Sequence, residues 1–194
     1  MALVTLEQAK AAANIEIRRS GYVGAKTLLK ESAKFVRSNY DIFLSHSKMD
    51  ENLVLGAKSI LEKKGYTVYV DWIDDPQLDR SKVNRKTADV LRIRMRSCKL
   101  MFYLHTKSAS LSKWCPWELG YFDGYTYPVP RVFIYPLMDE GERSFKGQEY
   151  LELYPVIDID DIGLSGKGRE DVWSHDPDAK RPFRRITGIL TEAL

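Results

Sequence analysis

The order of apolar and polar positions along the chain predicts short buried strands separated by helices. Nearly continuous apolar runs are typical of strands covered on both faces, and they occur at residues 40–45, 66–72, 100–105, 131–137 and 154–159. Apolar residues at helical spacing predict helices over 47–64, 84–96 and 114–125, and a closing helix over 183–194. Residues 160–181 show neither pattern, and we expect a loop there. The alternation predicts an α/β fold with a five-stranded parallel sheet and helices on both faces.

The first 38 residues differ from the rest because they are rich in alanine and contain no strand pattern. Helical spacing predicts one amphipathic helix over 3–19 and another over 25–36, with glycines between them. We therefore expect a helical N-terminal extension over 1–38 and the main domain over 39–194. The extension could cover the main domain or pair with a second copy, and the pattern leaves both arrangements open.

Composition and charge narrow the classes of partner. The chain is 44% hydrophobic and 29% charged, as in ordinary globular proteins, and its net charge is only +3. A nucleic-acid-binding face needs a stronger basic bias, so we expect no nucleic-acid partner. No apolar run approaches the roughly 20 residues that span a bilayer, and the N-terminus lacks the pattern of a secretory signal. We expect a cytoplasmic protein without a membrane partner.

Motif searches exclude several chemistries that use this architecture. The chain has no GxGxxG dinucleotide fingerprint, no P-loop and no GxSxG nucleophile elbow. Its two cysteines and three histidines lack metal-ligand spacing, so we expect no metal. Parallel sheets bind ligands beyond the carboxyl ends of their strands, which here carry residues 45–47, 72–79 and 105–118. These segments predict a site built on one carboxylate with aromatic neighbours.

Four segments, in order, resemble the motifs of Toll/interleukin-1 receptor (TIR) domains. The first is Tyr40-Asp-Ile-Phe-Leu-Ser-His-Ser47, followed by Asp50. The second is the strand 65–71 with its acidic loop, and the third is the strand segment 97–108. The fourth, 112–119, contains Trp-Cys-Pro-Trp-Glu-Leu and is similar to the Trp-Cys-x-x-Glu-Leu segment of the family. The resemblance implies a flavodoxin-like TIR fold.

Many TIR domains of bacteria and plants cleave NAD, and the resemblance implies which residues do so here. The catalytic glutamate of the family corresponds to Glu118, and its aromatic residue one turn earlier to Trp114. The ligand-contacting loop after the first strand corresponds to Ser45, His46 and Ser47. We add Asp75 as a candidate substrate contact, although Asp71, Asp74 and Asp75 fit loop formation and helix capping better than a role as bases.

One carboxylate suits this reaction. The nicotinamide of NAD is already cationic, so it leaves as a neutral ring without a proton donor. Positive charge then develops on the ribose, and a fixed carboxylate can stabilise it by roughly 3–4 kcal/mol. Pro116 near a helix start is tolerated, which places Glu118 where the helix dipole favours an anion. NAD is thus expected as the substrate, with no cofactor.

Three functions remain as hypotheses. The leading one is an NAD glycohydrolase or ADP-ribosyl cyclase, similar to the TIR proteins of Thoeris anti-phage systems, whose product acts on a separate effector. The resemblance also implies that TIR domains self-associate to complete the pocket. The alternatives are a non-catalytic TIR module that binds other TIR domains, and a nucleoside deoxyribosyltransferase-like enzyme. The sequence leaves open whether water or an adenine nitrogen attacks the ribose.

Overall fold

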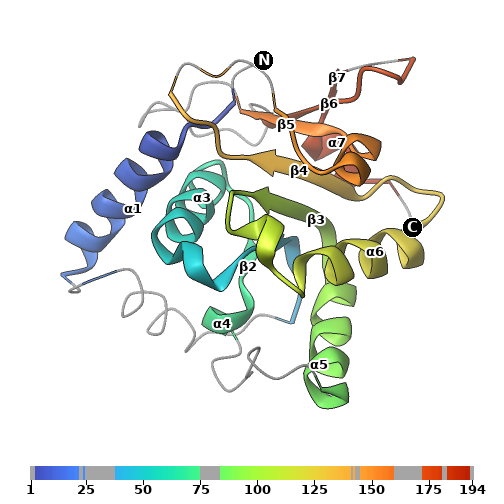
Figure 1. Cartoon of the computed structure of the whole chain (residues 1–194), viewed down its shortest axis with the longest axis horizontal. Coiled ribbons are helices and arrows are strands. Elements are labelled where there is room, and N and C mark those ends of the chain that lie inside the picture. The colour runs from blue at the N-terminus through green and yellow to red at the C-terminus, as the bar shows by residue number, and fades with distance from the viewer. Residues whose placement is uncertain are drawn as a thin grey trace.

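The chain folds around one mixed sheet (Figure 1). The computed structural model describes residues 3–21, 24, 38–74, 84–140, 142, 145–159, 172–180 and 183–192. Within these residues the sheet has seven strands in the order β2-β1-β3-β4-β5-β6-β7. Neighbouring strands from β2 to β5 pair in parallel, and β6 and β7 pair antiparallel. Their bounds are β1 Tyr40–Ser45, β2 Val68–Tyr69, β3 Cys98–His105, β4 Val132–Pro136, β5 Val156–Ile159, β6 Val172–His175 and β7 Phe183–Arg185.

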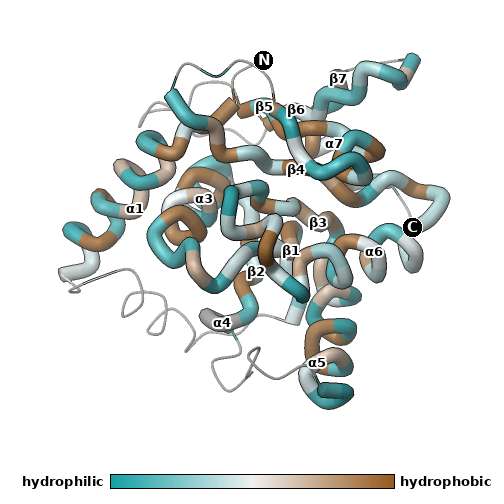
Figure 2. The backbone as a smooth tube through the Cα atoms, in the orientation of Figure 1, coloured by the Kyte–Doolittle hydropathy of each residue, from teal (hydrophilic) through white to brown (hydrophobic). Residues whose placement is uncertain are grey.

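Helices cover the two faces of the sheet. Their bounds are α1 Leu6–Ser20, η1 Lys48–Asp50, α3 Glu51–Lys63, α4 Asp71–Asp74, α5 Arg85–Arg96, η2 Ala109–Leu111, α6 Cys115–Thr126, η3 Glu149–Leu153 and α7 Ile186–Leu190. Side chains of a strand alternate between faces, so Phe102 packs in the core cluster with α1 and α3, whereas Tyr103 packs in the cluster with α5 and α6. Figure 2 shows the hydrophobic positions concentrated on the strands and on the inner sides of the helices.

The α/β class is confirmed, but the prediction of five strands is wrong. Strands β6 and β7 form an antiparallel hairpin at one edge of the sheet, where the sequence predicted a loop and the start of a helix. The closing helix is short, because residues 183–185 are strand and α7 covers only Ile186–Leu190. The second strand is also shorter than predicted, since residues 71–74 turn into α4. The predicted helix over 25–36 lies outside the described residues.

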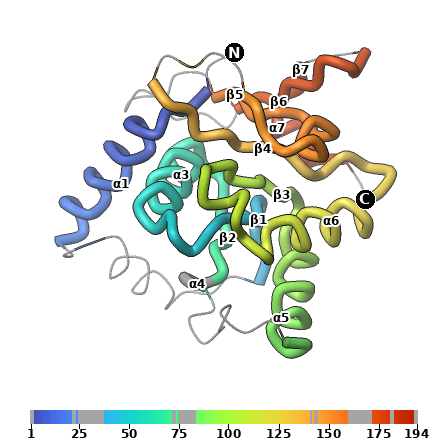
Figure 3. The backbone as a smooth tube through the Cα atoms, in the orientation of Figure 1, coloured from blue at the N-terminus to red at the C-terminus, as the bar shows by residue number. Residues whose placement is uncertain are grey.

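The N-terminal helix lies against the main domain. Val4, Ala9 and Ala13 are buried in the same core cluster as α3 and the sheet. At the start of the helix, the N–H of Leu6 donates to the Met138 carbonyl at 2.8 Å and the N–H of Met138 donates to the Val4 carbonyl at 2.9 Å. Figure 3 shows this N-terminal segment beside the chain that follows β4. Of the two arrangements considered for this segment, α1 therefore adopts the one that covers the domain.

A glycine permits the close approach of α1 to α3. A Cβ atom at Gly56 would lie 1.8 Å from the carbonyl oxygen of Ala9, far inside van der Waals contact. The absence of a side chain there lets the two helix backbones meet. Among the residues that the structure describes, no helix has the length and apolar character needed to cross a membrane.

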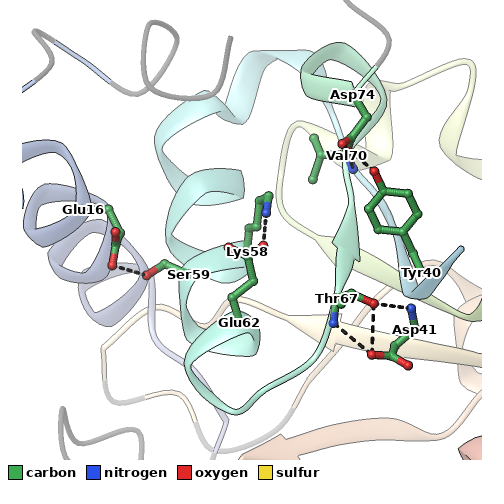
Figure 4. A network of polar contacts seen from close by, with 9 residues as sticks. All are labelled: Glu16, Tyr40, Asp41, Lys58, Ser59, Glu62, Thr67, Val70 and Asp74. Atoms are coloured by element: carbon green, nitrogen blue, oxygen red, sulfur yellow. Dashed lines mark hydrogen bonds and ion pairs between the residues drawn. The ribbon is translucent and has the colours of Figure 1, made fainter. Parts of the chain in front are cut away.

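Side-chain hydrogen bonds fix both ends of the short strand β2 against β1 (Figure 4). At its start, the Asp41 carboxylate accepts from the N–H and the hydroxyl of Thr67, both at 3.0 Å. At its end, the Asp74 carboxylate accepts from the Tyr40 hydroxyl and from the N–H of Val70, both at 2.8 Å. These contacts set the position of α4, which follows β2 at the carboxyl edge of the sheet.

Candidate functional site

Glu118 lies in the first turn of α6, as the sequence predicted. The hydroxyl oxygen of Ser112 accepts from the N–H groups of Trp114 and Cys115, at 3.3 and 3.2 Å, and so caps the start of this helix. Pro116 occupies the first turn, where N–H groups have no partner inside the helix. The N–H of Glu118 then makes the first regular helical bond, to the Trp114 carbonyl at 2.8 Å.

The carboxylate of Glu118 meets the last residue of β1. The Ser45 hydroxyl donates to Glu118 Oε2 at 2.6 Å, a length typical of a bond to an ionised acceptor. Both side chains are buried, with exposed fractions of 1% for Ser45 and 0% for Glu118. The site is therefore assembled at the carboxyl end of β1, but its carboxylate lies beneath the surface instead of at an open mouth.

Aromatic side chains surround this pair. Tyr103 of β3 is the register partner of Ser45, and burial raises the pKa of its phenol far above the ordinary value, with the charge of Glu118 acting in the same direction. Trp114 is buried and packs edge-on against Trp117, with 5.4 Å between ring centroids. Cys115 is fully buried and packs as a small apolar residue, as predicted. Tyr103 is thus a neutral, buried phenol within electrostatic reach of the carboxylate.

A row of aromatic side chains continues along α6, and arginines of α5 pack against it. Trp117 stacks on Tyr121 with 5.8 Å between centroids. The guanidinium of Arg92 lies 5.3 Å from the Trp117 ring and that of Arg96 lies 5.9 Å from the Tyr121 ring. Cation–π contacts of this kind hold α5 against α6. Arg92 and Arg96 thus have a packing role.

His46 turns away from Glu118 and contacts Asp71. Its Nδ1 lies 2.8 Å from the Leu44 carbonyl oxygen, and its Nε2 lies 3.4 Å from Asp71 Oδ1. The carbonyl can only accept, so Nδ1 donates to it, and Nε2 is the ring nitrogen that faces Asp71. Both side chains are 1% exposed. This buried contact ties the loop after β1 to the start of α4.

The remaining predicted contacts fall in different places. The Ser47 hydroxyl oxygen accepts from the N–H of Met49 at 3.3 Å and caps η1. Asp75 lies outside the described residues. The sequence did not identify Tyr103 or the role of Asp71 opposite His46, because both depend on which strands are neighbours and in what register. Among the described residues, no group of three or more His, Cys, Asp or Glu side chains is arranged to hold a metal ion.

Comparison with known proteins places this chain in a family. No family model matches the chain. The chain is 47% identical over 154 residues to "Probable 3' cyclic ADP-D-ribose synthase ThsB'" of Bacillus cereus (strain MSX-D12), which covers 78% of this chain and 77% of that protein. It is also 31% identical over 83 residues to "Putative cyclic ADP-D-ribose synthase TIR2" of Cytobacillus dafuensis, covering 42% of this chain and 22% of that protein. The match to ThsB' is longer than the segment 40–136 that carries the four TIR motifs, and this chain therefore belongs to the TIR protein family of ThsB'.

Proposed function

We propose that this chain cleaves the nicotinamide–ribose bond of NAD and closes the remaining ADP-ribose into a cyclic isomer that serves as an anti-phage signal. The observation that carries the proposal is the 47% identity to a protein named a 3' cyclic ADP-D-ribose synthase. The geometry supports it, because a single carboxylate is fixed at the carboxyl edge of the sheet by a 2.6 Å hydrogen bond.

The reaction needs one bond broken and one formed. The bond between the ribose C1 and the nicotinamide nitrogen breaks, and its electron pair leaves with the neutral nicotinamide. Glu118 stabilises the ribosyl cation that results, as preorganised charges do in other enzymes. For a 3' cyclic product, the 3' oxygen of the adenosine ribose attacks this cation and its proton passes to a base or to water. The overall products are cyclic ADP-ribose, nicotinamide and one proton.

We propose separate substrate contacts for the residues around Glu118. We assign the nicotinamide ribose to the loop of Ser45, His46 and Ser47, and stacking on a base to Trp114, with Asp75 as a further contact. The Ser45 hydroxyl contacts one of the two carboxylate oxygens, Oε2, and so fixes the direction of the Glu118 side chain.

We also infer that the protein acts in the cytoplasm, that it self-associates to complete its pocket, and that its product acts on a separate effector. Both cysteines are buried and form no disulfide, which fits a reducing compartment. Six large hydrophobic side chains among the described residues are exposed and available for contacts between copies: Met49, Ile93, Leu111, Tyr127, Leu153 and Phe183.

The test is incubation of the purified protein with NAD, followed by liquid chromatography and mass spectrometry. We expect equal amounts of nicotinamide and a product with the mass of cyclic ADP-ribose, which is one water lighter than ADP-ribose. Glu118→Gln keeps an acceptor for the Ser45 hydroxyl but removes the charge, so it should fold normally and lose about 10²–10³-fold in kcat. The enzyme proposal fails if concentrated wild-type protein releases no nicotinamide, or if Glu118→Gln releases it at the wild-type rate.

A further inference from the structure

A cavity lies at the carboxyl edge of the sheet, near the site described above. It has a volume of about 400 Å³ and sits at the ends of β3 and β4, between the loops that follow these strands. Leu6, in the first turn of α1, closes one side of it. This volume lies within the range of small-molecule sites. None of the residues assigned above to NAD cleavage lines the cavity.

The cavity is within reach of a ligand held at Glu118. Ser45 pairs with Tyr103, and His105, which lines the cavity, is two residues further along β3. Strand spacing and rise put the Cα atoms of Ser45 and His105 about 8 Å apart, which is less than the reach of a dinucleotide. Side-chain alternation places His105 on the same face of the sheet as Tyr103. The Thr106 hydroxyl of the cavity wall donates to Asp50 at 2.6 Å and so joins it to the loop that carries Ser45.

The lining combines an apolar surface with charged groups at the rim. Leu6, Met138 and Phe145 belong to the apolar part. The exposed charged residues are two cations and two anions: Lys107, Lys146, Asp139 and Glu142. Phe145 is fixed by an edge-on contact with His105, with 4.7 Å between ring centroids. An aromatic and aliphatic wall suits a planar base, and ammonium groups at the rim suit phosphates.

The existing contact of Lys107 does not block a phosphate. Lys107 Nζ lies 3.4 Å from Asp139 Oδ2, but the lysine side chain is 93% exposed and the aspartate 49%. Exposed pairs of this kind contribute little, so Lys107 can turn to a more highly charged partner. Asp139 also lines the cavity and can then accept from a ribose hydroxyl.

We propose that this cavity binds the ADP half of NAD, with the pyrophosphate at Lys107 and Lys146 and the adenine against Phe145 and Met138. The inference rests on the proposed function, because it places the part of the substrate that does not react. It gives α1 a place in the binding site through Leu6, although this helix precedes all four TIR motifs. The N-terminal helix thus has a binding role as well as a packing role.

The test compares two double variants with the same change of charge. Lys107→Ala/Lys146→Ala removes the rim cations. Lys99→Ala/Lys180→Ala removes two exposed lysines from the opposite, amino edge of the sheet, at the start of β3 and in the turn between β6 and β7. We expect the first pair to raise KM for NAD about tenfold, the scale of one or two charged hydrogen bonds, with kcat changed less than twofold. The control pair should leave both constants unchanged.

Binding of ADP, measured by calorimetry, separates this inference from the proposed function. ADP should bind the wild type, inhibit competitively against NAD, and bind about tenfold more weakly to Lys107→Ala/Lys146→Ala than to the control pair. If NAD is cleaved but ADP binding and KM are equal in the two double variants, the cavity is not the ADP subsite. Inhibition by ADP that is not competitive with NAD also overturns the assignment. If ADP binding depends on the two rim lysines but NAD is not cleaved, the subsite stands and the proposed reaction fails.

Discussion

Replacing Ser45 with alanine removes one hydroxyl and tests the central contact of the site. In the wild type this hydroxyl donates to Glu118 Oε2 at 2.6 Å, and both groups are buried. Without it, the carboxylate keeps its burial but loses a charge-assisted donor. A hydrogen bond to a charged group contributes about 1.5–3 kcal/mol, so we expect Ser45→Ala to lower the free energy of unfolding by about 2 kcal/mol. For a domain of this size that corresponds to a fall in Tm of about 4–8 °C.

A double-mutant cycle isolates the contact from other effects of the substitution. Unfolding in urea is measured for wild type, Ser45→Ala, Glu118→Gln and the double variant, with circular dichroism as the signal. The amide in Glu118→Gln is neutral, so removal of the Ser45 hydroxyl should lower the free energy of unfolding of this variant much less than that of the wild type. The coupling energy between the two positions should therefore be about 1 kcal/mol or more. If Ser45→Ala lies within about 0.5 kcal/mol of wild type and the coupling is zero, the reasoning about this buried pair is refuted.

Two further predictions concern stability elsewhere in the fold. Gly56→Ala should lower the free energy of unfolding by about 1–3 kcal/mol or more through overpacking, because its Cβ would lie 1.8 Å from the Ala9 carbonyl oxygen. Gly124→Ala, at a helical position with open space, is the matched control. Equal urea midpoints for the two variants would contradict the prediction. Burial lowers the pKa of His105 below its ordinary value. As the pH falls below about 6.5, this histidine therefore takes up a proton in the unfolded chain before it does so in the folded protein, and the free energy of unfolding decreases. His105→Gln should reduce the loss of stability between pH 7.5 and pH 5.5, and an unchanged pH dependence of the urea midpoint would argue against this role of His105.

The sequence predicted the central strands because their burial on both faces leaves a strong local signal. Strand β1 is buried at every position, and its predicted bounds match the observed ones. The edge strands leave a weaker signal. Strand β6 reads Val-Trp-Ser-His with alternating burial, and β7 reads Phe-Arg-Arg with no buried residue. Such strands are defined by their partner across the hairpin, which a local pattern does not contain.

The candidate site was predictable to the level of segments but not of contacts. Parallel strands bring their carboxyl ends to one edge, so the proximity of the loop after β1 to Glu118 followed from the fold. Which loop residue reaches Glu118 depends on side-chain direction: Ser45 shares a face with α6, whereas His46 meets Asp71 after β2. The contact of His46 with Asp71 requires the β1–β2 register. That register is set by backbone pairing and by the Asp41–Thr67 hydrogen bonds, which the motifs do not encode.

The burial of Glu118 bears directly on how one carboxylate can act without a second. An exposed carboxylate is screened by water, and its interaction with a cation a few ångströms away is correspondingly weak. In a site that excludes water, the same charge interacts more strongly and needs no reorganisation during the reaction. The half of NAD that does not react can supply the free energy needed to bring the ribose to a buried carboxylate, so the proposed mechanism uses the cavity beside β3 and β4 together with Glu118.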